Sequence, residues 1–273
     1  MVYLAIPLND VINRINDGPA GKLLEKARIK SSVREVYRAI VEAGTEDVRD
    51  ININGKIIRL GQQSFVEIRT LEAFTNERPV IEDLCDRVTS TDVIWDIGAN
   101  IGAHSCAIKK TNPEAKVIAF EPVPQTANRI QANSELNDVE INVQQFAISN
   151  TDGEIQMNIE AESSISSQNS LSIDDGDITV ESARADSLLQ RGIEQPSVLK
   201  IDVEGAEGLV LEGAPSVISK SRLVYCEVHL DRIGDFGSTY ESIRKQFTDL
   251  GFETDEFHQR NNELFLRCTK SKN

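Results

Sequence analysis

The stretch that decides the fold is WDIGANIG, residues 95–102, which ends the apolar run TDVIWD and leads into the helix-like IGAHSCAIKK. Its glycines, Gly98 and Gly102, do not match the G-x-G-x-x-G spacing of dinucleotide-binding enzymes. Glycines allow a tight backbone turn and a close approach to a ligand. Asp96, beside this turn, would repel a pyrophosphate. The stretch therefore predicts a strand, a ligand-binding turn and a helix, for a cationic or amino-bearing ligand.

Further along the chain, strands and helices alternate. The apolar runs AKVIAFEP, INVQQFAI, SVLKID and RLVYCEVH are typical of buried strands, and the segments 125–136 and 206–219 are typical of helices. This alternation predicts an α/β fold with a parallel sheet and right-handed crossovers. The last two runs, FETDEFHQR and NELFLRCT, meet at Asn261-Asn262 and predict an antiparallel hairpin at the end of the sheet.

Residues 1–88 are predicted to form an N-terminal cap or accessory region, and residues 89–273 the main domain. The cap would contain an amphipathic helix at 22–43 capped by Gly44, a hairpin turning at Asn54-Gly55, and further helices. Within the main domain, residues 161–182 are rich in Ser, Asp and Gly. Two interpretations remain for them, a solvated surface insertion and a mobile loop over a substrate cleft.

Composition excludes several classes of protein. Among 273 residues, 44 acidic side chains against 29 basic ones give a net charge of −15, which argues against nucleic acid and membrane surfaces as partners. Four cysteines without a CxxC pair argue against a structural zinc site and favour reduced thiols. The N-terminus is too short and wrongly flanked for a signal peptide, and no stretch is long enough to span a membrane. A cytoplasmic location is expected.

Carboxylates stand at the ends of two predicted strands. Glu121 ends the strand after Asp96, 25 positions on, where a carboxylate can accept hydrogen bonds from both hydroxyls of a ribose. Asp96 and Glu121 together suit S-adenosylmethionine, which carries an amino acid moiety and a ribose. A simpler interpretation of Asp96 is the N-cap of the helix that follows.

A second group of polar residues follows the fourth and fifth strands. Asp202 falls at the carboxyl end of the fourth strand, where open α/β sheets bind ligands. Glu204 and Glu207 are expected in the first turn of a helix, where the helix dipole favours carboxylates. This structural role is enough to explain Glu207, whereas for Glu204 a structural and a functional role are both open. Glu227 and His229 end the fifth strand.

Two histidines fall outside this polar group. We expect His104 to pack or to face solvent, and His258 to lie at the surface.

The motifs WDIGANIG, AFEP, LKIDVEGAE and CEVH, in this order, resemble the FkbM-type family of S-adenosylmethionine-dependent methyltransferases over residues 91–230. The resemblance implies a Rossmann-like class I methyltransferase fold with a mostly parallel sheet ordered 3-2-1-4-5-7-6, whose seventh strand is antiparallel. The N-terminal helix and hairpin would be added to this fold. The resemblance also implies O-methylation of hydroxyls on sugars or on polyketide-type metabolites.

The resemblance carries the family's cofactor-binding roles over to matching positions. The set is Asp96, Gly98, Ala99, Asn100 and Gly102 in the loop, Glu121 and Pro122 at the ribose, and Ala147 beside the adenine. The usual acidic contact to the adenine is missing, and Asn150 and Asp152 are its candidate substitutes.

Methyl transfer to a hydroxyl requires alignment of the acceptor oxygen and removal of its proton. We expect His229 or Asp202 to accept that proton, with Glu204 and Glu227 orienting the acceptor. A Mg2+ ion held by Asp202, Glu204 and Glu227 is the alternative. The acceptor would be a small molecule or a glycan.

Three other functions were weighed against O-methylation. They are a nicotinamide-dependent oxidoreductase, a catalytically inactive binding module, and a protein or nitrogen methyltransferase. The glycine spacing and Asp96 argue against the first, and the polar sheet edge argues against the second. The absence of an Asn/Asp-Pro-Pro-Tyr motif argues against the third. The sequence does not fix the oligomeric state.

Overall fold

The computed structural model describes residues 47–62, 64–159, 170–172 and 176–270. The predicted helix at 22–43 and its Gly44 cap lie outside the described residues, as does the part of the predicted insertion at 161–169.

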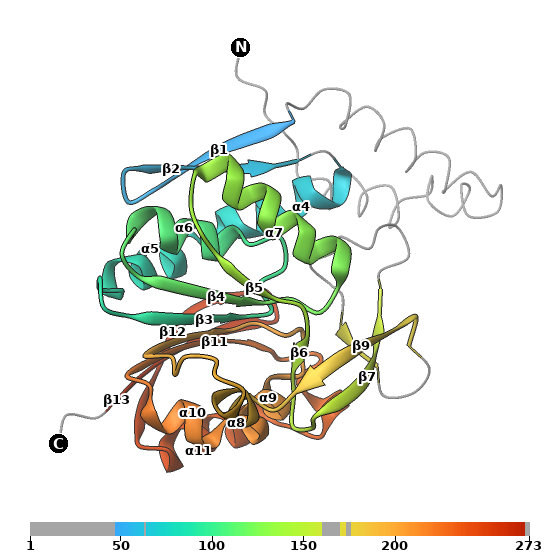
Figure 1. The fold of residues 1–273 in the computed structure, drawn as a ribbon. Helices are drawn as coiled ribbons and strands as arrows, with labels where there is room; N and C mark the ends of the chain where they lie inside the picture. The colour runs from blue at the N-terminus through green and yellow to red at the C-terminus, as the bar shows by residue number, and fades with distance from the viewer. Residues whose placement is uncertain (1–46, 63, 160–169, 173–175, 271–273) are drawn as a thin grey trace, which may run out of the picture. The chain divides into compact units, whose positions relative to one another are not determined.

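A seven-stranded sheet forms the centre of the molecule, in the order β12-β13-β11-β10-β3-β4-β5 (Figure 1). Strands β5, β4, β3, β10 and β11 run parallel, and β13 is antiparallel to both of its neighbours. This confirms the predicted order 3-2-1-4-5-7-6 and the terminal hairpin. The strands are β3 (Val93–Ile97), β4 (Lys116–Phe120), β5 (Asn142–Gln144), β10 (Val198–Ile201), β11 (Leu223–His229), β12 (Phe252–Arg260) and β13 (Glu263–Lys270).

Helices cover both faces of this sheet, which explains why its central strands β3 and β10 are buried along their whole length. One face packs against α5 (Arg78–Arg87), α6 (Ala103–Thr111) and α7 (Pro124–Asn137), with α4 (Phe65–Asn76) and the hairpin β1 (Val48–Ile53) and β2 (Lys56–Gly61) beside them. The other face packs against α8 (Ala185–Gln190), α9 (Glu207–Gly213), α10 (Pro215–Lys220) and α11 (Tyr240–Asp249). A 3-10 turn, Ile233–Phe236, follows β11.

The described part of the predicted cap shares the core of the sheet. The turn between β1 and β2 has positive φ at Asn54 and Gly55, 47° and 77°, and confirms the predicted two-residue hairpin. Helix α4 begins at a capping box formed by Ser64 and Glu67. Residues 47–273 form one compact unit, and the domain boundary at residue 88 stays a prediction.

The prediction that INVQQFAI forms one strand was wrong, because this segment contains two short strands in different sheets. Strand β5 ends at Gln144, and the chain then leaves the main sheet and enters a four-stranded sheet ordered β6-β9-β7-β8. The strands of this small sheet are β6 (Ala147–Ile148), β7 (Gly153–Asn158), β8 (Ser170–Leu171) and β9 (Ile178–Ala183).

The prediction that residues 161–182 form an insertion without regular structure was wrong for the last residues of this range, which belong to strand β9. Val180 and Ser182 point into the protein, whereas Thr179 and Glu181 are exposed. A strand with one solvated face carries polar residues on that face. In this segment the buried face also carries a polar residue, Ser182, so the sequence shows no clear alternation of apolar and polar residues.

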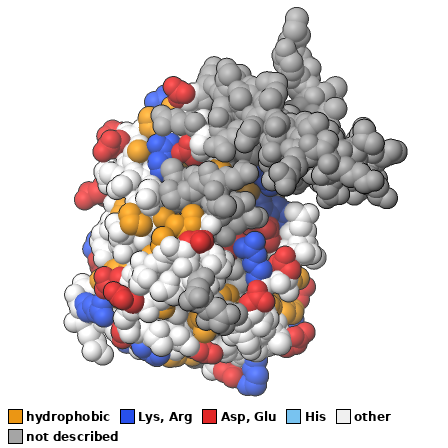
Figure 2. All heavy atoms as spheres, turned by 90° about the vertical axis from the view of Figure 1, so that its right-hand side faces the viewer, with side chains coloured by type: hydrophobic (Ala, Val, Ile, Leu, Met, Phe, Trp, Pro, Cys, Tyr) orange, Lys and Arg blue, Asp and Glu red, His pale blue; other side chains and the backbone are white. Residues whose placement is uncertain are grey.

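The described surface is mixed in charge. On the face shown in Figure 2, acidic and basic side chains are interspersed, with small hydrophobic areas between them. All four cysteines are buried free thiols, and burial raises the pKa of Cys85 to about 11 and that of Cys106 to about 12. Among the helices that the structure describes, none combines the length and the apolar character that crossing a membrane requires.

Candidate active site

The turn after β3 needs glycine at two positions. Gly98 and Gly102 both have φ of +78°, a region that other residues rarely adopt. A Cβ atom on Gly98 would lie 1.8 Å from the carbonyl oxygen of Asp202, and one on Gly102 would lie 2.8 Å from Cγ2 of Ile130. The predicted turn therefore packs directly against the segment that follows β10, which brings the two predicted groups of site residues together.

Asp96 lies within β3 and is fully buried. Its Oδ2 accepts a hydrogen bond of 2.6 Å from the Ser105 hydroxyl, and its Oδ1 lies 3.7 Å from Nζ of Lys200 with no hydrogen bond. Asp96 is not the helix N-cap, because Gly102 holds that position. The Oδ1 atom of Asn100 is likewise buried, without a hydrogen bond to any residue that the structure describes. The turn thus contains two acceptors that a ligand with N–H donors would satisfy.

Glu121 joins this turn to the end of β4. Its carboxylate accepts 3.0 Å hydrogen bonds from the backbone N–H groups of Asn100 and Val123. Burial raises the pKa of Glu121 to about 7. The two hydrogen bonds lower this pKa by less than burial raises it, and the negative charge of Asp96 adds a smaller increase. Each carboxylate oxygen keeps a lone pair for a further donor.

The remaining predicted cofactor residues follow β4 of the main sheet or belong to the small sheet. Pro122 is half-buried after Glu121, and Ala147 is buried in β6. Asn150 and Asp152, the candidate substitutes at the adenine, have other partners: Asn150 donates to Glu212, and Asp152 accepts from Ser187 and from the Arg184 backbone.

Lys200 is a buried cation that the sequence analysis did not place in the site. It stands opposite Asp96 in the β3–β10 pair, and its Nζ donates to Oδ2 of Asp202 at 2.9 Å. Burial alone would raise the pKa of Asp202, but the charges of Lys200 and His229 outweigh it and hold the pKa below its ordinary value. A lysine inside an otherwise apolar strand is the signal that could have predicted this ion pair.

His229 is held by a carboxylate that the sequence analysis explained by the helix dipole alone. Glu207, the first residue of α9, is fully buried, and its Oε1 lies 2.8 Å from Nδ1 of His229. The same oxygen accepts a 3.0 Å hydrogen bond from the Gly205 N–H. Because an ionised carboxylate only accepts, Nδ1 donates, and Nε2 is the nitrogen that faces the site.

Burial would lower the pKa of His229. The hydrogen bond to Glu207 and the charges of Glu204 and Asp202 outweigh it and raise the pKa to about 9.

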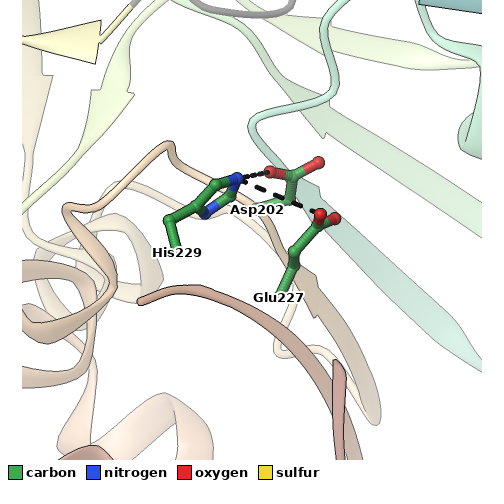
Figure 3. Close-up of side chains that lie close together, drawn as sticks. All are labelled: Asp202, Glu227 and His229. Carbon is green, nitrogen blue, oxygen red and sulfur yellow. Dashed lines mark ion pairs between the residues drawn. The ribbon is translucent and has the colours of Figure 1, made fainter. Parts of the chain in front are cut away.

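The four predicted catalytic side chains lie together at the carboxyl edge of β10 and β11. Nε2 of His229 is 3.4 Å from Glu204, 3.9 Å from Asp202 and 4.0 Å from Glu227; Figure 3 shows the last two of these carboxylates. Burial raises the pKa of Glu204 to about 8 and that of Glu227 well above its ordinary value. The site therefore gathers carboxyl groups whose ionised forms are disfavoured by burial, and a cationic ligand beside them would stabilise those forms.

The expected helical position of Glu204 was wrong. Its φ is +54°, in a turn that Gly205 continues, and the helix begins only at Glu207. In this turn the Glu204 carboxylate reaches Nη1 of Arg232 at 2.7 Å.

The two histidines outside the polar group have partners of their own, although the charge of His104 also contributes to the lowered pKa of Asp202. His104 packs edge-on against Phe74, with 5.2 Å between ring centroids, and its Nε2 lies 3.3 Å from Glu77, which confirms a packing role. His258 is half-buried against Phe265 in β12, less exposed than expected.

Comparisons with known proteins identify the family of this chain. The model of the Methyltransferase FkbM domain matches residues 96–254. Hexuronic acid methyltransferase AglP of Haloferax volcanii is 31% identical over 65% of this chain and 72% of its own length. The 2-O-methyltransferase NoeI of Sinorhizobium fredii is 32% identical over 50% of this chain and 62% of its own length.

A crystal structure of a methyltransferase FkbM from Methylobacillus flagellatus aligns with a TM-score of 0.48 and 15% identity, over 67% of this chain and 44% of that one. The family assignment therefore rests on the sequence comparisons, and the class I fold on the observed strand order. This chain belongs to the FkbM family of methyltransferases.

Proposed function

We propose that this protein transfers a methyl group from S-adenosylmethionine to a hydroxyl oxygen of a sugar or glycan. The observation that carries the proposal is the gathering of Asp202, Glu204, Glu227 and His229 directly beside the glycine turn, where Gly98 contacts the Asp202 backbone. The names of two relatives, a hexuronic acid methyltransferase and a 2-O-methyltransferase, support a sugar-like acceptor.

The residues of the turn fit the proposed methyl donor. The buried Oδ1 atoms of Asp96 and Asn100 have no hydrogen bond, and an ammonium group supplies such donors. Glu121 retains lone pairs for ribose hydroxyls while its backbone hydrogen bonds fix its position. S-adenosylmethionine supplies an electrophilic methyl group on a positively charged sulfur, so the protein has to position and deprotonate the acceptor.

Asp202 and His229 are the groups proposed to handle the acceptor proton. Asp202 stays ionised and its side chain is 23% exposed, so it can accept a hydrogen bond from a bound hydroxyl. His229, with a pKa of about 9, holds a proton at neutral pH in the protein without ligand. A cationic ligand beside these carboxylates would lower that pKa, and Nε2 would then accept the proton. Glu204 and Glu227 would orient the acceptor.

The acidity of this edge favours a neutral acceptor oxygen. A hexuronic acid offers both hydroxyl groups and a carboxylate, and the carboxylate would meet the negative charges of Asp202 and its neighbours. We therefore expect methylation at a hydroxyl group.

The test uses the full chain with methyl-labelled S-adenosylmethionine and a panel of hexoses, hexuronic acids and their glycosides, with products identified by mass spectrometry. We expect one added methyl group on a hydroxyl. His229→Gln should reduce turnover at least about 100-fold, as for loss of a general base. His258→Gln, the matched control, should retain full turnover.

Calorimetric titration with S-adenosylmethionine and with NAD separates the alternative functions. Binding of the methyl donor that weakens in Glu121→Ala would support the proposal. Absence of such binding would refute it, and preference for NAD would indicate an oxidoreductase. Binding without transfer to any acceptor would favour an inactive binding module.

A further inference from the structure

We propose that Asp202, Glu227 and His229 form a site for one divalent cation, selective for Mn2+ or a later first-row ion over Mg2+. One ligand atom of each residue lies within 4.8 Å of the other two. Nε2 of His229 is 3.9 Å from Oδ1 of Asp202 and 4.0 Å from Oε1 of Glu227. Neighbouring donors bonded to one ion at about 2.1 Å lie about 3.0–3.4 Å apart, so the three side chains would have to move closer together by roughly 0.5–1 Å on binding.

Two of the three ligands are already turned toward a common point. Lys200 holds Oδ2 of Asp202 at 2.9 Å and leaves Oδ1 facing His229. Glu207 holds Nδ1 of His229 at 2.8 Å and leaves Nε2 facing the carboxylates. A histidine that binds a metal commonly donates its other N–H to a carboxylate in this way, which fixes its tautomer and raises its basicity.

Glu227 gives a second indication that this site takes a cation. Its side chain is only 3% exposed and makes no hydrogen bond with any residue that the structure describes. The Nη2 atom of Arg260 forms an ion pair with Oε1 of Glu227 at 3.6 Å, without a hydrogen bond. Figure 3 shows the Glu227 carboxylate on the side of His229 that bears Nε2. An ion pair of this length compensates a buried carboxylate only in part, and a bound cation would compensate the rest.

The ligand types determine which ion is expected. Mg2+ prefers oxygen ligands alone, whereas imidazole favours transition ions, and a mixed set of two carboxylates and one imidazole suits Mn2+. Glu204, which the sequence analysis included in a Mg2+ site, is held by Arg232 at 2.7 Å and is not part of the proposed set.

The use of this ion rests on the proposed function. A divalent ion at this edge would bind the acceptor hydroxyl and lower its pKa, so that an alkoxide forms near neutral pH. His229 would then act as a ligand instead of the proton acceptor described above, and the released proton would pass to solvent.

The test is Mn2+ titration of the full chain after chelator treatment, without methyl donor, followed by electron paramagnetic resonance. We expect one strongly bound Mn2+ per chain and, in pulsed spectra, coupling to a histidine nitrogen. Glu207→Gln should weaken binding by about 10- to 100-fold, and His229→Gln by more. His258→Gln should bind as the wild type does.

Two outcomes would overturn the metal site. One is the absence of a strong site in the wild type. The other is Mn2+ binding without nitrogen coupling that persists in His229→Gln, which would indicate surface carboxylates only. The nitrogen coupling is measured on the wild type, so the test stands even if a variant fails to fold.

Failure of the metal site and failure of the proposed function are distinguishable. Methyl transfer that continues undiminished in chelator would overturn the catalytic use of the ion and leave the proposed function standing. Bound Mn2+ without transfer to any acceptor would count against the proposed function alone.

Discussion

Replacing Gly98 by alanine should push apart the two loops that form the site. The new Cβ would lie 1.8 Å from the Asp202 carbonyl oxygen, whereas real Cβ contacts stay at 3.0 Å or more, so the loops must separate by 3.0 − 1.8 = 1.2 Å. A left-handed backbone costs about 1–2 kcal/mol for alanine, and overpacking adds about 1–3 kcal/mol. The free energy of unfolding should therefore fall by about 2–5 kcal/mol, and Tm by about 4–20 °C.

Gly192→Ala is the matched control, because it isolates the backbone effect. Gly192 has φ of +88° and no atom within 4 Å of the added Cβ, so its replacement should reduce stability by only about 1–2 kcal/mol. Differential scanning calorimetry compares the two variants, and titration with S-adenosylmethionine should show at least about tenfold weaker binding for Gly98→Ala alone. Equal losses of stability in both variants would refute the role assigned to the contact with Asp202.

Three further predictions concern buried carboxylates. The pKa of Glu121 in the folded protein is raised to about 7, so the folded state holds this proton more tightly than the unfolded state does. The wild type should therefore lose stability relative to Glu121→Gln as the pH rises from about 5 to 8. Denaturant unfolding at about pH 5 and at about pH 8 measures the difference. The pKa of Asp92 is lowered, because its hydrogen bonds to Arg222, Ser197 and Thr89 outweigh burial. Wild type should therefore exceed Asp92→Asn in stability near neutral pH and lose this advantage below about pH 4, as thermal melts would show. Ser105→Ala removes the 2.6 Å hydrogen bond to Asp96 and should weaken methyl-donor binding by about tenfold in calorimetry; unchanged affinity would show that Asp96 does not depend on this partner.

The fold could be predicted because its sequence signals are local. Each central strand is a short apolar run, and polar residues stand at the ends that meet at one edge: Asp96, Glu121, Asp202 and His229. The parallel arrangement follows from the helices between the strands. The strand ends therefore predict that these four side chains lie at one edge of the sheet.

The rest depended on contacts between distant parts of the chain. Glu207 meets His229 across 22 positions, and nothing in a run of helix-forming residues reveals that its first carboxylate is fully buried. The left-handed turn at Glu204 is set by the close approach of Gly205 to Arg232, where a Cβ would lie 2.7 Å from the arginine Cβ. Polar residues on the solvated face hid strand β9.

The position of β13 has a consequence for synthesis of the protein. Strand β13 lies between β11 and β12, although it is translated after both of them. While the ribosome makes residues 230–262, β11 is therefore an open edge, and its strand-end residues Glu227 and His229 lack the neighbours Phe265 and Glu263. Open edges pair readily with other chains, so this interval is when aggregation of nascent chains is expected. Assembly of the acidic site is accordingly a late event, completed only after residue 270 has left the exit tunnel.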